Sequence, residues 1–442
     1  MTAQSAPRGV LETVRAVAQG DLDPRAAIAA CAERARACEP AVGAFNAFAD
    51  LESIDPGRGP LAGVTVGVKD IIATKDMPTT CGSPIFEGHV PPEDAAVVAR
   101  LKALSAVMLG KTTTTEFAWR NPTATRNPWN LAHTPGGSSA GSAVAVACGA
   151  VDVALGTQTY GSVIRPAAYN GVVGLKPSFG SIPRAGVHPL AQSLDHVGLF
   201  TRSVDDAAYM LCLLMEGDGG ALPPAPPFQV PLEGLAPFPA PRIGLLMGPE
   251  WDQMAPDQRE TLRKAADLLA KAGMVVEDFA LPGPFRELRP MAATLCTAEG
   301  AFNLGALADR FPDKSSPAMK ALVDAGRDVP AVAYIQALQA QKALRRGFSG
   351  ALSGFDVLLT APAYGEAPEG LGDTGDPALC VPWTTLGVPT ITLPAGLGAR
   401  GLPLGIQLVA PFAEDLKLLR VAKACELALA YAAPLAPVAA AA

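Results

Sequence analysis

Lys69 stands in a setting that would remove its amine from water. It follows the apolar run at residues 64–68 and precedes Asp70 and two isoleucines, in the segment GVTVGVKDII, so we expect it at the buried end of a strand. A lysine amine that loses its hydration titrates at a lower pH and can act as a base near neutrality. From this context alone, a lysine that merely pairs with Asp70 carries equal weight.

A second segment, PGGSSAGS at residues 135–142, places two serines between glycines and a small-residue helix. Hydroxyls and free backbone amides at a helix N-terminus favour anions or oxyanions. Serine is also a common N-cap, so Ser138 or Ser139 has the alternative role of starting the helix. A nucleotide-binding P-loop fits less well, because GxxxxGK[ST] is absent and Lys176 in GVVGLKPS precedes a proline.

The third segment, GTQTYGSVIRPA at residues 156–167, predicts a strand whose tight terminal turn exposes the hydroxyl of Ser162. Successive backbone N–H groups in such a turn can converge on a carbonyl oxygen, as a nucleophile's site requires. An ordinary strand-to-helix turn would be the better explanation of a lone Gly-Ser. The functional interpretation therefore depends on the combination of the three segments.

In this order the three segments resemble the amidase signature family. Its serine-rich stretch is matched by GGSSAGSAVAVACGAVDVALGTQTYGSVIRPAAYNGVVGLKPSFG and its catalytic-lysine strand by GVTVGVKDII. The similarity extends over nearly the whole chain, through AFNAF, GKTTTTEFAW, RNPWN, SLDHVGLFTRSVDD and LPLGIQLVAP. These motifs are highly specific for fold and reaction class and poorly specific for substrate.

The resemblance implies a Ser-Ser-Lys triad. Ser162 falls on the family's nucleophile, Ser138 on its proton-relaying serine, which follows a cis peptide bond, and Lys69 on its neutral base. The expected reaction is hydrolysis of a carboxamide or urea-type C–N bond to acid and ammonia or amine, through an acyl-enzyme on Ser162. The resemblance implies neither a metal nor an organic cofactor.

The resemblance also implies an oxyanion hole made by backbone N–H groups of residues 159–162, which include Thr159, Tyr160 and Gly161. Ser139 would support the relay by hydrogen bonding, although N-capping explains it equally well. Many members have Asp-x-Gly-Gly-Ser where this chain has Gln158 to Ser162. Tyr160 keeps an amide N–H, but its ring would either reshape the pocket or fill a hole vacated elsewhere.

Other residues near the expected site receive no role. Several aromatic residues fall on segments that border the family's site, and an aromatic residue is more often core than ligand wall. Arg184 and His188 could face an acidic substrate, yet their stretch also resembles a structural part of the family. The aromatic residues are Phe117, Trp119, Trp129, Tyr364 and Trp383.

The elements that would position these segments alternate between strands and helices. Residues 10–37 predict two amphipathic helices, with Asp21 or Asp23 capping the second and Pro24 in its first turn. Short apolar strands and helices then alternate to about residue 205, and late strands precede a final amphipathic helix. No internal repeat is visible. The pattern predicts a mixed, largely parallel α/β core.

We therefore expect the amidase signature fold: a large, mixed, mostly parallel twisted sheet with helices on both faces and a helical cap. A single domain would span residues 1–442, with the signature core at about 60–205 and a variable lid or cap at about 215–350. The C-terminal strands and helix would occupy about 355–432, and the Ala/Pro tail at 433–442 would be disordered.

Composition narrows the range of functions. The chain has 442 residues, 49% of them hydrophobic and 17% charged, so it can bury a large core. A net charge of −7 provides no basic face for nucleic acid. Eight scattered cysteines form no CxxC pair and four histidines match no metal motif, which predicts reduced thiols and no metal site. With no signal peptide or membrane-spanning stretch, we expect a soluble, cytoplasmic protein.

Three functions remain in competition. The first is a hydrolase of small-molecule amides, which acts alone or in a small complex. The second is the glutaminase subunit of a transamidating complex, which would need a docking surface and a partner. The third is a non-catalytic binding protein on the same scaffold. The sequence leaves a homodimer and a small accessory subunit both open.

Overall fold

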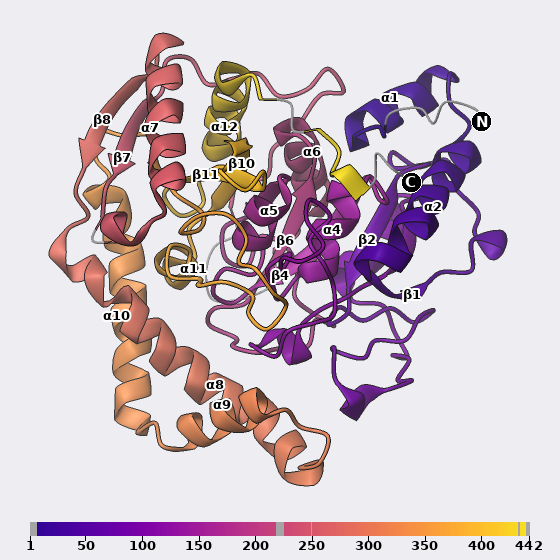
Figure 1. Ribbon diagram of the computed structural model, residues 1–442, viewed down its shortest axis with the longest axis horizontal. Coiled ribbons are helices and arrows are strands. Elements are labelled where there is room, and N and C mark those ends of the chain that lie inside the picture. The colour runs from indigo at the N-terminus through magenta and orange to yellow at the C-terminus, as the bar shows by residue number, and fades with distance from the viewer. Residues whose placement is uncertain (1–6, 218–224, 249, 432–433, 439–442) are drawn as a thin grey trace.

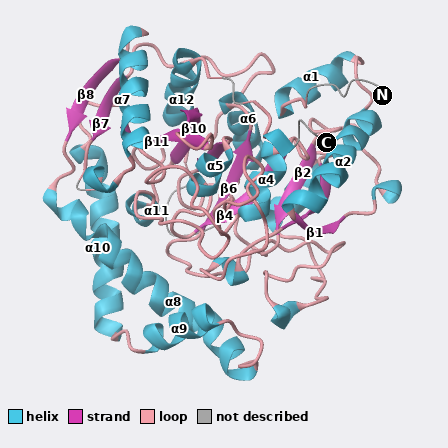
Figure 2. Cartoon of the chain, viewed as in Figure 1, coloured by secondary structure: helices cyan, strands magenta, loops and turns pink. Residues whose placement is uncertain are grey.

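One mixed sheet of eleven strands runs through the part of the chain that the computed structural model describes, residues 7–217, 225–248, 250–431 and 434–438. Helices cover both of its faces (Figures 1 and 2). The strands are β1 (Phe45–Phe48), β2 (Thr65–Lys69), β3 (Val107–Thr112), β4 (Val153–Gln158), β5 (Val173–Lys176), β6 (His196–Thr201), β7 (Arg242–Leu246), β8 (Val275–Phe279), β9 (Val357–Thr360), β10 (Thr390–Leu397) and β11 (Pro403–Val409).

The helices fall between and after these strands. They are α1 (Val10–Gln19), α2 (Pro24–Val42), α3 (Ala96–Ala103), α4 (Ala140–Ala147), α5 (Ile164–Asn170), α6 (Val204–Leu214), α7 (Pro256–Lys271), α8 (Leu288–Arg310), α9 (Pro317–Arg327), α10 (Ala331–Ala351), α11 (Val381–Leu386) and α12 (Asp415–Leu429). Short 3-10 turns occupy Leu51–Ser53, Pro84–Phe86, Glu116–Ala118, Trp251–Gln253 and Gly283–Glu287.

The order of strands across the sheet is β1-β3-β2-β4-β6-β5-β10-β11-β9-β7-β8. Within it, β2-α3-β3 followed by β4-α5-β5-β6-α6 has the same sequence of elements as β7-α7-β8 followed by β9-α11-β10-β11-α12. The two halves meet where β5 pairs antiparallel with β10. The fold therefore contains a repeat of topology, which the sequence does not reveal.

The expectation of a mostly parallel sheet is wrong. Four strand pairings are parallel and six are antiparallel among the described residues. In each half a helix connects two strands of the same direction, and the next strand inserts antiparallel between them, β6 between β4 and β5 and β11 between β9 and β10. An inserted strand buried on both faces has the same unbroken apolar pattern as a parallel one.

Alternating residues of β4 show how the sheet separates two core layers. Val153 and Leu155 belong to a cluster that includes residues of α1, α3, α6, α7 and α12. Ala154, between them, packs with residues of α2, α4 and α5 on the opposite face. This period of two is what a strand covered on both faces requires.

The N-terminal helices form as the sequence predicts. The carboxylate of Asp23 accepts a hydrogen bond from Ala26 N at 3.0 Å, and Pro24 is the first residue of α2. Asp23 is therefore the cap, and Asp21 is not, because a side chain at the N-cap position can reach a free amide of the first turn.

The helical cap consists of α8, α9 and α10, which project from the body of the molecule at the lower left of Figure 1. It begins later than the expected lid at 215–350, because β7, α7 and β8 belong to the sheet layer. In the tail, Ala436 is buried and its N–H donates to Ala147 O, so the expected disorder is wrong for residues 434–438. Residues 433 and 439–442 lie outside the described residues.

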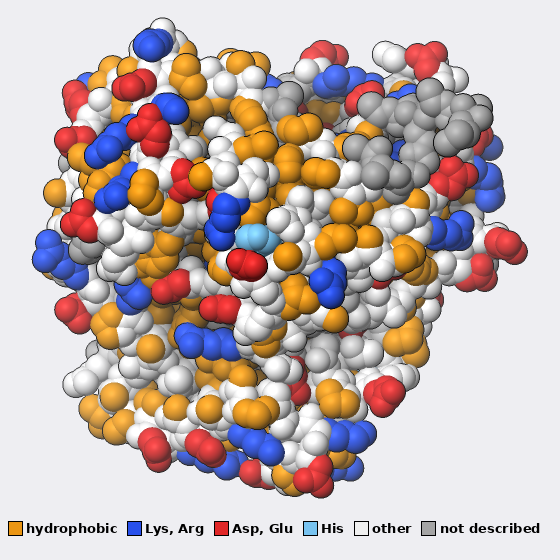
Figure 3. All heavy atoms as spheres, in the orientation of Figure 1, with side chains coloured by type: hydrophobic (Ala, Val, Ile, Leu, Met, Phe, Trp, Pro, Cys, Tyr) orange, Lys and Arg blue, Asp and Glu red, His pale blue; other side chains and the backbone are white. Residues whose placement is uncertain are grey.

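Two expectations drawn from the whole sequence concern membrane-spanning helices and a basic face for nucleic acid. No helix in the described residues is long and apolar enough to cross a membrane. Figure 3 shows Lys and Arg side chains interspersed with Asp and Glu over the visible face. That face presents no continuous basic patch of the kind that nucleic acid requires.

Candidate active site

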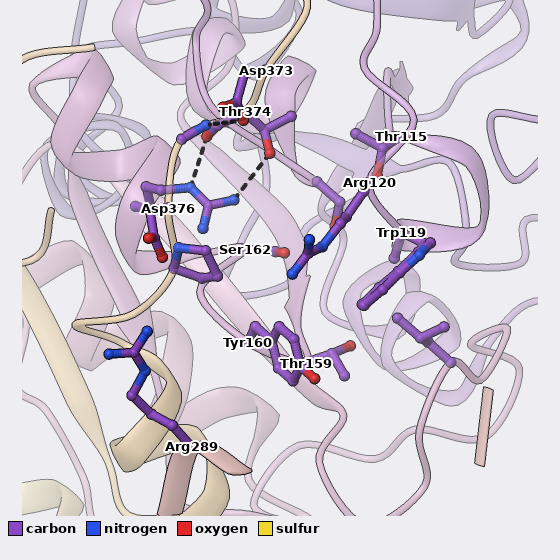
Figure 4. Close-up of a pocket in the computed structure, with 16 residues that line it drawn as sticks. Thr115, Trp119, Arg120, Thr159, Tyr160, Ser162, Arg289, Asp373, Thr374 and Asp376 are labelled. Carbon is purple, nitrogen blue, oxygen red and sulfur yellow. Dashed lines mark hydrogen bonds between the residues drawn. The ribbon is translucent and has the colours of Figure 1, made fainter. Parts of the chain in front are cut away.

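A cavity of about 390 Å³ lies where the turn after β4 meets two loops, one following β3 and one preceding α11. Ser138 and Ser162 both line it, with 4% and 8% of their surface exposed. In Figure 4 the hydroxyl of Ser162 points into the open space, with Arg120 on one side and Arg289 on the other. The two serines expected to act together therefore share one cavity.

Lys69 ends β2 beneath this cavity and is completely buried. Its amine lies 2.7 Å from the hydroxyl of Ser138 and 2.7 Å from the hydroxyl of Thr157, and donates to Thr157 O at 3.3 Å. Burial lowers the pKa of Lys69 well below its ordinary value, while the negative charge of Asp195 opposes that change. Burial thus favours the neutral form of this amine.

Lys69 and Asp70 do not form the ion pair that the sequence left as an alternative. Asp70 lies 3.6 Å from Lys111 Nζ and accepts hydrogen bonds from Asn46 and Thr80. Consecutive residues in a strand point to opposite faces, so Lys69 and Asp70 separate.

Ser138 and Ser139 enter α4 differently from simple caps. The Gly137–Ser138 peptide bond is cis, as the resemblance implies. Ser139 occupies the N-cap position, yet its side chain makes no capping bond. Its hydroxyl instead donates to Thr157 O at 3.2 Å and accepts from Thr157 N at 3.3 Å. Ser139 therefore fixes the residue that holds Lys69.

Gln158 organises the turn that carries Ser162. Its side-chain oxygen accepts from Val163 N at 2.8 Å and Ile164 N at 3.0 Å, and its amide nitrogen donates to Thr384 Oγ1 at 2.8 Å. The Thr384 hydroxyl donates to Tyr160 O at 2.7 Å. The Gln158 side chain thus satisfies backbone N–H groups of the two residues that follow Ser162 and connects the turn to α11.

The ring of Tyr160 forms part of the cavity wall. It lies edge-on to Trp119, with ring centroids 5.8 Å apart, and its hydroxyl donates to Ala292 O in α8 at 3.3 Å. Burial raises the pKa of the phenol, so the hydroxyl stays protonated. The ring therefore spans from the turn after β4 to α8 of the cap.

Thr159, the first residue of the expected oxyanion hole, is tied to Asp195. Its hydroxyl donates to Asp195 Oδ1 at 2.6 Å, and Leu190 N and Ala191 N donate to Oδ2 at 2.9 Å. Burial raises the pKa of Asp195 to about 6. Asp195 lies in the motif SLDHVG, yet the sequence alone suggested no role for it.

Charged residues for which the sequence suggested no role surround Ser162. They are Arg120, Arg165, Arg289, Asp373 and Asp376. Arg165 is 4% exposed and donates to Thr374 O at 2.8 Å and Gly137 O at 2.9 Å. Its Nη1 has no acceptor among the described residues. Its place three residues after the expected nucleophile could have indicated a role for Arg165, because an arginine is rarely buried without partners.

The residues to which the sequence assigned no role lie in different parts of the structure. Trp119 lines the cavity. Phe117 is buried and stacks near His188, with ring centroids 5.0 Å apart, while Trp129 donates to Asn170 O at 2.9 Å. Arg184 and His188 line a neighbouring cavity.

Tyr364 packs against a small buried cluster that includes Met254. Trp383 is buried, does not line the cavity of Ser162, and borders a further cavity. Within the described residues no group of histidine, cysteine or acidic side chains could hold a metal ion, and the cysteines are unpaired.

This arrangement can be compared with known proteins. A model of the Amidase family matches residues 26–419. The chain belongs to the amidase family. Its reaction class is accordingly that of the amidase signature hydrolases, which act on C–N bonds.

Three similar proteins show which functions occur among its relatives. The chain is 33% identical to a glutamyl-tRNA(Gln) amidotransferase subunit from Rhodopirellula baltica, over 94% of this chain and 95% of the relative. Its fold matches a 6-aminohexanoate cyclic dimer hydrolase with a TM-score of 0.87 and 26% identity, covering 98% of this chain and 99% of the other. It also matches the corresponding amidotransferase subunit from Thermotoga maritima, with a TM-score of 0.80, 28% identity and coverage of 96% and 94%. Its relatives thus include both hydrolases and amidotransferase subunits.

Proposed function

We propose that the chain hydrolyses a carboxamide or urea-type C–N bond through a covalent acyl-enzyme on Ser162. The observation that carries the proposal is the contact between a fully buried Lys69 amine and Ser138, in the cavity that Ser162 also lines. A buried, neutral amine is a competent base, and a hydroxyl between base and nucleophile can pass the proton.

In the first half-reaction, Ser162 Oγ attacks the carbonyl carbon of the amide. Its proton moves to Ser138 Oγ as Ser138 passes its own proton to Lys69 Nζ. Backbone N–H groups of residues 159–162 stabilise the negative charge that develops on the carbonyl oxygen. The relay then returns the proton to the leaving nitrogen, the C–N bond breaks, and ammonia or an amine departs.

In the second half-reaction, water replaces the departed amine. The neutral relay removes a proton from the water as its oxygen attacks the acyl carbon. Collapse of the second tetrahedral intermediate breaks the bond to Ser162, which recovers its proton. The product is the carboxylic acid, and the bond changes balance without any further reactant.

The test is ammonia release from a panel of amides that contains glutamine, small aliphatic amides, aryl amides and urea derivatives. Turnover of one class, lost in Ser162→Ala and in Lys69→Ala, supports the proposal. Absence of turnover across the panel, together with no labelling of Ser162 by a fluorophosphonate, contradicts it and favours a non-catalytic binding protein.

The amidotransferase subunit is the second candidate, because relatives with 33–36% identity carry that name. For this chain it would mean that Ser162 hydrolyses glutamine and that a partner receives the ammonia. Glutamine turnover that rises when the chain is co-expressed with a co-purifying subunit would favour it. Turnover of other amides by the isolated chain, with glutamine inactive, would favour the independent hydrolase.

A further inference from the structure

A second cavity, of about 750 Å³, opens beside the catalytic cavity. It lies between the ends of β7 and β9, the start of α8, and α11. Apolar side chains supply most of its wall, among them Leu246, Met254, Leu281, Phe285, Leu379 and Trp383. We refer to it as the apolar cavity. Its size is that of sites which enclose a drug-sized molecule.

The apolar cavity adjoins the catalytic one. Arg289 of α8 lines both cavities, and Ala378 of the apolar cavity directly follows Pro377 of the catalytic cavity. In Figure 4 the guanidinium of Arg289 lies at the side of the catalytic cavity, below Asp376. Arg289 therefore lies at the boundary between a polar cavity and an apolar one.

Trp383 belongs to a cavity wall that is mainly apolar. It is only 2% exposed, and its indole nitrogen is itself buried. The polar residues of the lining are Glu250, Arg286, Arg289 and Thr360. Such a wall suits a ligand that is mainly hydrocarbon.

We infer that the apolar cavity binds an alkyl or aryl group attached to the amide substrate, while the amide itself lies against Ser162. The inference rests on the proposed function and adds the substrate class, amides with a long hydrophobic substituent. Transfer of such a group from water into the cavity would be favoured by about 25 cal/mol for each Å² of apolar surface that it buries.

The variant that tests the inference is Met247→Trp. Met247 lines the apolar cavity and is 42% exposed, so a larger side chain there can occupy the cavity without disturbing the core. Leu268→Trp is the matched control. Leu268 is 41% exposed on α7 and lines neither cavity.

Binding is measured by calorimetry in the Ser162→Ala background, so that no substrate is consumed. The ligands are 6-phenylhexanamide, with its substituent on the acyl side, and N-(5-phenylpentyl)acetamide, with its substituent on the amine side. We expect Met247→Trp to weaken binding of one of them at least ~10-fold, which is about 1.4 kcal/mol. Leu268→Trp should leave both affinities unchanged. The ligand affected identifies the side of the amide that faces the apolar cavity.

Equal affinities in Met247→Trp and Leu268→Trp, or no binding of either ligand, would overturn the inference. With Ser162 intact, Leu268→Trp should turn over acetamide at the wild-type rate, because Leu268 lines neither cavity. An enzyme that binds 6-phenylhexanamide in the expected manner yet hydrolyses no amide would contradict the proposed function alone.

Discussion

The amine of Lys69 lies 2.7 Å from the hydroxyl of Ser138, although 69 residues separate them in the sequence. One comes from the end of β2 and the other from the turn that enters α4. Neither residue is more than 4% exposed. In the proposed mechanism this base and this hydroxyl belong to one proton relay, whose members should act as a unit.

Effects of substitution in the relay should therefore not be additive. We expect Ser162→Ala and Lys69→Ala each to lower kcat/KM at least ~10³-fold, and the double variant to be no slower than Ser162→Ala. Amide turnover under pseudo-first-order conditions measures all three. Lys176→Met is the control, because Lys176 is also fully buried but donates to Val388 O at 2.6 Å, outside the cavity. Multiplicative losses in the double variant would mean that the two residues act independently.

The pH profile of the reaction should report Lys69. Burial lowers its pKa, and only the neutral amine accepts a proton. The value of kcat/KM should therefore rise with pH through that lowered pKa and level off well below 10.5, the ordinary lysine value. A rate that keeps rising to the pH at which an ordinary lysine titrates would show that Lys69 is charged in the resting enzyme.

Asp195 should shift this profile. Its negative charge opposes the lowering of the Lys69 pKa, and its own pKa of about 6 makes it ionised at neutral pH. Asp195→Asn removes the charge, so the acid limb of the profile should move to lower pH. The single side-chain oxygen of Asn can still accept from Leu190 N and Ala191 N, but its NH2 group then replaces the oxygen that accepts from the Thr159 hydroxyl. We therefore expect about a 10-fold loss of kcat from a looser Thr159. A loss of kcat with an unmoved limb would limit Asp195 to holding Thr159.

How far the sequence predicts this site depends on which contacts are local. Ser138 and Ser162 lie in motifs whose turns and glycines carry their own signal, and the strand character of residues 65–69 buries Lys69. The fold class and the cis peptide bond followed from the family resemblance that these motifs carry. In contrast, Arg120, Arg289 and Asp376 meet only through long-range packing, and a charged residue on a loop has no local pattern that distinguishes it from an ordinary surface charge.

The sequence failed to predict the direction of the strands for a related reason. Hydrophobic periodicity records which faces of a strand are buried but not the direction of its neighbours. β6 and β11 are buried on both faces, as parallel strands are, so the sequence alone could not show that they insert antiparallel. The repeated topology of the two halves was hidden because the halves share the order of elements without a visible repeat of residues.

Tyr160 should limit the size of the substrate. Its ring occupies the wall beside Ser162, and Tyr160→Ala keeps the backbone N–H while it removes that wall. We expect kcat/KM for bulky aryl amides to rise about 10-fold relative to acetamide, within the ~1–3 kcal/mol that pocket shape controls. Tyr160→Phe retains the ring and loses the hydroxyl's contacts with Ala292 O and Cys296 of α8, so the ratio should change less than about 2-fold. An equal change in both variants would assign the effect to the bond with α8.

The packing of the cap against itself depends on Gly326. A Cβ atom there would lie 1.9 Å from Thr297 O and 2.5 Å from Ala301 Cβ, so α9 approaches the backbone of α8 more closely than any side chain permits. Gly326→Ala should force the two helices apart and destabilise the cap by about 1–3 kcal/mol. Thermal unfolding and limited proteolysis of residues 288–351 measure the effect.

The control for this variant is Gly347→Ala, at an exposed position in α10 with nothing within 4 Å. It should stabilise its helix by about 0.5–1 kcal/mol, because alanine restricts the unfolded chain more than glycine does. Equal behaviour of the two variants would mean that the α8–α9 contact gives the cap no stability. If the contact is needed, Gly326→Ala should also raise KM for amides, because α8 supplies Arg289 and the acceptor for Tyr160.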